Sequence, residues 1–110
     1  MADEIRLETM TVAPEVLETI ADIATREVEG VEGVDGSGLV DLIGGGRGIA
    51  VSVDDAGALV VTLHVRVAYG INMRDVATGV QHAIADAMQV MTGHTVGAVD
   101  VYVDGVVFPE

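Results

Sequence analysis

The sequence contains no cysteine. This absence excludes thiol nucleophiles, thiolate metal sites and disulfide bonds, and it agrees with a reducing compartment. No apolar run reaches the roughly 18 residues that a helix needs to cross a bilayer, and the acidic start Met1–Glu4 is the reverse of a secretion signal. From these absences we expect a soluble, cytoplasmic protein.

Positive charge is scarce, because lysine is absent and all five cationic side chains are arginines. Against 18 Asp and Glu residues they leave a net charge of −13 at pH 7. Such a field repels phosphate backbones and anionic lipid headgroups, which argues against direct binding of nucleic acid or membrane. The acidity has two interpretations, solubility alone or a preference for basic partners, and the sequence leaves both open.

Several segments have the two-residue period of strands. In Val96–Phe108, from Val99 onward, valines alternate with polar residues, which predicts a half-buried strand, and its many β-branched residues favour a central place in the sheet. Ile49–Asp54 and Ala58–Tyr69 alternate in the same way on either side of a turn, which predicts a hairpin. Leu7–Val12 adds a short segment of high strand propensity.

Two segments have a helical period instead. The first is predicted to begin at Pro14 and to stop at Gly30, and the second to run from Met73 to about Met91 with Asn72 as its N-cap. Apolar residues three and four positions apart predict one buried stripe on each helix. The stripe residues are Val16, Leu17, Ile20, Ile23, Ala24 and Val28 in the first helix and Val76, Ala77, Val80, Ala83, Ile84, Ala87, Met88 and Met91 in the second. The methionines fit either an adaptable groove or core filling, and core filling is the favoured interpretation.

Residues 30–48, between the first helix and the hairpin, hold eight of the 14 glycines. Because the backbone entropy of glycine opposes helix and strand, this region is predicted to be a loop, with one helical turn at Leu39–Ile43. Its glycine clusters raise the hypothesis of a phosphate cradle. The second cluster precedes a strand, however, and no Gly-Lys-Ser/Thr follows the first, so the geometry of anion binding at a helix terminus is missing.

These elements together predict an α+β fold. We expect a two-layer sandwich, in which an antiparallel or mixed sheet of three to four strands carries two amphipathic helices on one face. The length of 110 residues predicts a single domain over 1–110. On the polar face of the sheet, His64 and Arg66 are expected to lie across from Asp100 or Asp104.

The sequence lacks the patterns of catalytic and metal sites. His64, His82 and His94 fall on a strand, a helix and a loop, without the spacing that puts two ligands on one helix face. The acids fall on predicted solvent-exposed faces, and neither Ser37 nor Ser52 lies in a nucleophile elbow. We therefore predict a protein that is not an enzyme and that uses no metal or cofactor.

Six short motifs follow one another along the chain, with a glycine-containing loop after the first. They are Glu27–Val31, Arg47–Ile49, Val67–Gly70, Val80–Gln81, Met91–Gly93 and Val101–Phe108. Each motif is weak alone. Together and in this order, over Leu7–Phe108, they resemble the alkaline shock protein family of bacterial envelope stress response proteins.

The resemblance implies a non-enzymatic cytoplasmic protein of the cell-envelope stress response in Gram-positive-type bacteria. It implies a self-associating scaffold or adaptor, recruited to the inner face of the membrane through a membrane-anchored partner. The residues expected to contact partners are Arg47 in the glycine loop and His64, Arg66, Tyr102 and Asp104 on the polar sheet face. An exposed edge strand would allow self-association by strand addition.

An alternative function follows from the same glycine loop. In this alternative the protein is a small regulatory or anion-binding module that serves a metabolic enzyme, and Arg47 supplies the charge. Phosphate or nucleotide binding that depends on Arg47 would distinguish this module from the scaffold.

Overall fold

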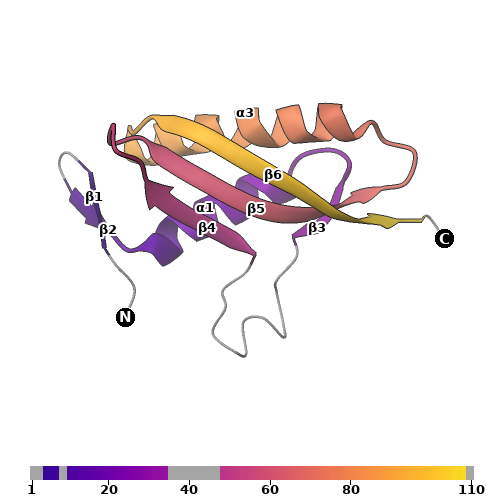
Figure 1. Cartoon of the computed structure of the whole chain (residues 1–110), viewed down its shortest axis with the longest axis horizontal. Helices are drawn as coiled ribbons and strands as arrows, with labels where there is room; N and C mark the ends of the chain where they lie inside the picture. The colour runs from indigo at the N-terminus through magenta and orange to yellow at the C-terminus, as the bar shows by residue number, and fades with distance from the viewer. Residues whose placement is uncertain (1–3, 8–9, 35–47, 109–110) are drawn as a thin grey trace.

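The computed structural model describes residues 4–7, 10–34 and 48–108. Two helices pack on one face of a mixed sheet formed by four strands, and a small hairpin lies beside them (Figure 1). This arrangement confirms the predicted α+β sandwich. In chain order the elements are β1 (Ile5–Leu7), β2 (Met10–Val12), α1 (Pro14–Arg26), β3 (Val31–Val34), β4 (Ile49–Val53), β5 (Leu59–Ala68), α3 (Met73–Thr92) and β6 (Val96–Val107).

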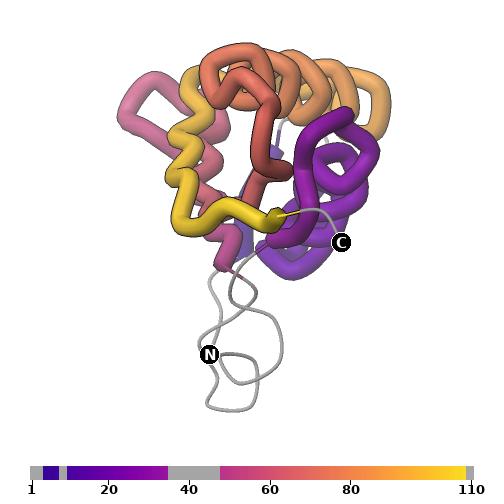
Figure 2. The backbone as a smooth tube through the Cα atoms, turned by 90° about the vertical axis from the view of Figure 1, so that its right-hand side faces the viewer, coloured from indigo at the N-terminus to yellow at the C-terminus, as the bar shows by residue number. Residues whose placement is uncertain are grey.

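β5 is the central strand of the sheet. β6 pairs with it in parallel, from Leu59 opposite Val96 to Ala68 opposite Val107, and β3 and β4 pair antiparallel with its other side. The prediction that Val96–Phe108 forms the central strand is therefore wrong, since β6 lies at an edge, away from α1 (Figure 2). β6 does have one partly buried face, as its alternating sequence predicts. A high valine content does not distinguish a central strand from a half-buried edge strand, because both accept valine.

β3 and β4 follow one another along the same side of β5. Val34 pairs with Val65 and Ile49 pairs with Leu63, while the amide of His64 donates to the carbonyl of Gly48 at 3.1 Å. The chain thus leaves this side of β5 after Val34 and is again beside β5 at Gly48, opposite His64. The predicted hairpin of β4 and β5 is confirmed.

The predicted loop over 30–48 is wrong for Val31–Val34, which form a strand. Pairing with β5 outweighs the low strand propensity of Gly33, because Val31 and Val34 gain the partners Val67 and Val65. The helical turn predicted at Leu39–Ile43 lies outside the described residues. Leu7–Val12 is likewise not one strand, since β1 and β2 form a hairpin in which Ile5 pairs with Val12.

α1 begins at Pro14 as predicted but ends at Arg26, before the expected stop at Gly30. Gly30 has a φ of +98° and lies in the turn into β3, where its carbonyl accepts a hydrogen bond from the amide of Ala68 at 2.9 Å. The predicted ends of α3 are confirmed. The side chain of Asn72 caps its start by accepting from the amide of Asp75, and Gly93 ends it in the left-handed conformation.

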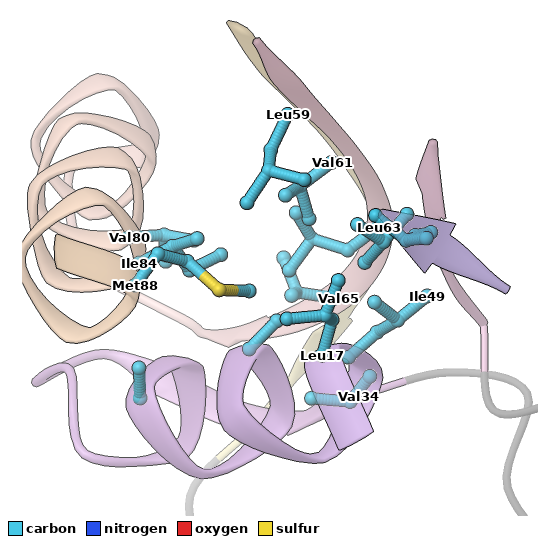
Figure 3. Close-up of a cluster of buried hydrophobic side chains, with 14 of the residues drawn as sticks. Leu17, Val34, Ile49, Leu59, Val61, Leu63, Val65, Val80, Ile84 and Met88 are labelled. Carbon is cyan, nitrogen blue, oxygen red and sulfur yellow. The ribbon is translucent and has the colours of Figure 1, made fainter. Parts of the chain in front are cut away.

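The core lies between the helices and β5 (Figure 3). The odd-numbered residues of β5 all point into it, where they cluster with three residues of α1 and four of α3; these residues are Leu59, Val61, Leu63, Val65, Val67, Leu17, Ala21, Ala24, Val76, Val80, Ile84 and Met88. The predicted stripes are wider than the surface that becomes buried. Val16, Ile23 and Met91 belong to the predicted stripes and are exposed, because each helix buries only the side chains that face the sheet or the other helix. In the described part of the chain, no helix combines the length and apolar character needed to cross a membrane.

Candidate functional site

The helix-free face of β5 and β6 carries four of the five predicted partner-binding residues. His64 and Arg66 come from β5, and Tyr102 and Asp104 come from β6. They share this face because their neighbours in sequence point into the core. Arg47 lies outside the described residues.

His64, Tyr102 and Asp104 form a compact group. His64 is the register partner of Tyr102, and their rings stack with centroids 4.7 Å apart and planes inclined by 14°. The Nδ1 atom of His64 lies 2.8 Å from Oδ2 of Asp104. The register shifts between Val103 and Gly105, and this bulge places Asp104 within reach of the imidazole. The residue opposite His64 is therefore Tyr102 and not the expected Asp100 or Asp104, but the side chain of His64 does contact Asp104.

Arg66 lies beside this group, but the prediction that it faces Asp100 or Asp104 is wrong. Its partner is Gly105, because the bulge in β6 shifts the pairing by one residue. A Cβ at Gly105 would lie 3.1 Å from the Cγ atom of Arg66, and a Cβ at Gly33 would overlap its guanidinium. The two glycines therefore let this long side chain lie flat across the sheet.

All three aromatic residues of the chain are exposed. Tyr69, Tyr102 and Phe108 expose 61%, 52% and 68% of their surface. Tyr69 and Phe108 stack with centroids 4.7 Å apart, one residue beyond the ends of β5 and β6. Aromatic side chains are usually core or interface residues, so their exposure here makes this surface the candidate for contacts. We call Tyr69, Phe108 and the four residues His64, Arg66, Tyr102 and Asp104 the β5–β6 surface.

The candidate residues predicted from the sequence do not include Tyr69 and Phe108. The signal was present, because each stands at the end of a predicted strand and together with Tyr102 they make up the whole aromatic content. The stacking itself could not be predicted, since it depends on the parallel pairing of β5 with β6.

The outer edge of β6 is also part of this side of the molecule. No segment in the described ranges pairs with it. The side chain of Gln81 in α3 donates from Nε2 to the carbonyl of Val99 at 3.1 Å, so this carbonyl points away from β5. The backbone groups of Val101 and Val103 point the same way, because the register is regular from Val99 to Val103.

The described residues do not form an enclosed reaction site on this surface. His64 and Asp104 expose 40% and 41% of their side chains, so they lie on an open face. The other two histidines are elsewhere: His82 is exposed on α3, and Nε2 of His94 lies 2.7 Å from the carbonyl of Gly57. Within residues 4–7, 10–34 and 48–108, no three His, Asp or Glu side chains are arranged to hold a metal ion. An open face of this kind suits contacts with macromolecules better than small-molecule chemistry.

Fold and surface thus define an α+β protein with an exposed aromatic and charged face on its sheet. The model of the alkaline shock protein family, which is described as having a cell envelope-related function, matches residues 2–108. The chain belongs to this family.

The relatives extend this comparison. The uncharacterized protein YqhY of Bacillus subtilis is 30% identical over 112 residues, which cover 96% of this chain and 82% of YqhY. The uncharacterized protein Spy1535 of Streptococcus pyogenes serotype M6 is 28% identical, over 89% of this chain and 78% of its own length. Among solved structures, a variant of the MamM CTD has a TM-score of 0.58 at 14% identity, covering 83% of this chain and 95% of that chain. This last likeness is one of fold alone.

Proposed function

We propose that the protein is a non-enzymatic adaptor of the cell-envelope stress response, which assembles copies of itself and is held at the membrane by a membrane-anchored partner. The exposure of all three aromatic side chains along β5 and β6 carries this proposal. Aromatic residues are enriched among the side chains that dominate binding energy at protein interfaces. Membership of a family with a cell envelope-related function supports the cellular setting.

The edge of β6 is the proposed contact between copies. Two β6 strands that pair antiparallel around a two-fold axis at Val101 place Asp100 of each copy opposite Tyr102 of the other. An axis at Tyr102 would instead place Asp100 opposite Asp104, and like charges directly opposite one another are destabilising. The axis at Val101 also uses backbone groups that already point away from β5. We therefore favour this register.

The proposal of a membrane-anchored partner is based on the net charge of the chain. With a net charge of −13, the chain is repelled by an anionic lipid surface, so a second protein must supply the attachment. Assembly of several copies raises the strength of such an attachment, because each further contact forms at high effective concentration.

Affinity capture tests this function. The tagged full chain is used as bait on the detergent-solubilised membrane fraction and on the soluble fraction of the bacterium that encodes it. We expect one membrane-spanning protein, recovered from the membrane fraction and absent with the tag alone. Combined Tyr102→Ala and Phe108→Ala changes should lower its recovery about tenfold, because a bait that does not assemble loses multivalent capture.

The matched control is Val53→Ala, which removes an exposed apolar side chain from β4 on the other side of the sheet. This variant should capture as the unmodified chain does. Recovery of partners from the soluble fraction alone, or equal recovery by all baits, would rule out the adaptor.

A further inference from the structure

A second apolar surface lies on the helix layer, apart from the β5–β6 surface. A groove of about 440 Å³ runs between α1 and α3. Alanines form much of its lining and allow a close approach of another backbone, and larger aliphatic side chains stand beside them. The lining residues are Ile20, Ile23, Ala24, Glu27, Val28, Ala83, Asp86, Ala87 and Met91, and we call this feature the helix groove.

Large apolar side chains remain exposed at the helix groove. Ile23 of α1 and Met91 of α3 expose 55% and 64% of their surface, and Val90 beside Met91 exposes 75%. Val16 is also exposed, and it lies on the same side of α1 as Ile23 because seven residues make two helical turns. The exposed apolar strip therefore extends along the helices beyond the groove itself. Such a long strip fits an elongated occupant.

The charged residues of the helix groove have one sign. Its lining contains two carboxylates, Glu27 directly after α1 and Asp86 of α3, and no arginine or histidine. The nearby Arg26 is paired with Asp22 on its own helix at 2.7 Å. An apolar groove with acidic residues on both sides is complementary to an apolar segment that carries lysine or arginine at its flanks.

We infer that the helix groove docks an amphipathic helix of the partner, with an apolar stripe at i, i+3, i+4 and i+7 and basic residues beside it. This inference rests on the proposed function, because the cytoplasmic segments next to a membrane span are enriched in lysine and arginine. A basic amphipathic segment of an anchored protein therefore has the chemistry that the groove selects. The β5–β6 surface then remains available for contacts between copies.

A synthetic peptide about 18 residues long tests the inference, with leucines in the apolar stripe and lysines elsewhere. A second peptide replaces every lysine with glutamate. Binding of each labelled peptide is measured by fluorescence anisotropy, and the bound surface is mapped by amide chemical shifts in NMR. We expect the lysine peptide to bind and to shift the amides of Ala24, Ala83 and Ala87, and the glutamate peptide to bind at least about tenfold more weakly.

Met91→Gln should weaken binding of the lysine peptide about tenfold, because it places a polar group in the apolar contact. The matched control is Met73→Gln, at the opposite end of the same helix, where an exposed methionine lies outside the groove. The affinity of this control for the lysine peptide should stay within about twofold of that of the unmodified chain. Glu27→Gln combined with Asp86→Asn should remove most of the preference for lysine over glutamate, whereas Glu32→Gln with Asp55→Asn should not.

The inference is overturned if the lysine peptide does not bind, if it shifts amides of the β5–β6 surface instead, or if Met73→Gln and Met91→Gln have equal effects. It is also overturned if Met91→Gln abolishes self-association, because a second copy would then occupy the groove. If the peptide does not bind but a membrane protein is captured, the proposed adaptor function holds and the docking site is ruled out. If the peptide binds but no membrane protein is captured, the docking site holds and the adaptor function is ruled out.

Discussion

The guanidinium of Arg66 occupies the space that a side chain at Gly33 would need. We predict that Gly33→Ala changes stability by less than about 1 kcal/mol, because the group that must move is the end of a flexible side chain and alanine restricts the unfolded chain. In an Arg66→Ala background the same change should stabilise the protein by about 0.5–1 kcal/mol. Urea unfolding of the unmodified chain, the two single variants and the double variant gives the coupling free energy between the two residues. Independent effects would show that Arg66 does not lie over Gly33.

Leu17 and Ile23 lie on the same helix but differ in burial. Leu17→Ala should cost about 2–5 kcal/mol, because it leaves a cavity in the core. Ile23→Ala should cost no more than about 0.5 kcal/mol, because this side chain is exposed. Chemical denaturation measures both costs. Similar losses for the two variants would mean that the helix groove is closed in solution.

The hydroxyl of Thr25 is buried in α1 and has no hydrogen-bond partner among the described residues. Thr25→Val replaces this hydroxyl with a methyl group of similar size. We predict that it stabilises the protein by about 1 kcal/mol, because the cost of burying an unpaired polar group is removed. Thr25→Ser keeps the hydroxyl, loses the methyl group and should destabilise. A destabilising Thr25→Val change, measured by thermal unfolding, would show that the hydroxyl is bonded after all.

The sequence predicts those features that depend on short-range patterns. The hairpin of β4 and β5 follows from alternation around a turn, and the start of α3 follows from Asn72 as an N-cap. The pairing of segments that are distant in the sequence is harder to predict from it. The alternation in β6 specifies which face is buried but not which strand lies beside it, so the edge position and the parallel direction come only from the structure.

Part of the candidate site could also be predicted. His64, Arg66, Tyr102 and Asp104 share a face because a strand has a period of two. The contact of His64 with Asp104 needs the bulge in β6 as well as the pairing of β5 with β6. The position of Arg66 opposite Gly105 depends on the bulge in β6, which no sequence pattern indicated. The helix groove was missed because helical periodicity assigns Ile23 and Met91 to the buried stripe, and only the packing of α1 against α3 shows which apolar residues stay uncovered. The anion-binding alternative depends on Arg47, outside the described residues, and stays a prediction.

The most direct test of the account is amide hydrogen exchange across β6 at low and high protein concentration. We predict that the amides of Val99, Val101 and Val103 become more protected at high concentration, while those of β4 do not change, and that the sedimentation mass rises above 11.3 kDa. This result would place the contact between copies on the edge of β6. Exchange in β6 that is independent of concentration, with a mass that stays at 11.3 kDa, would contradict the assembly on which the proposed adaptor depends.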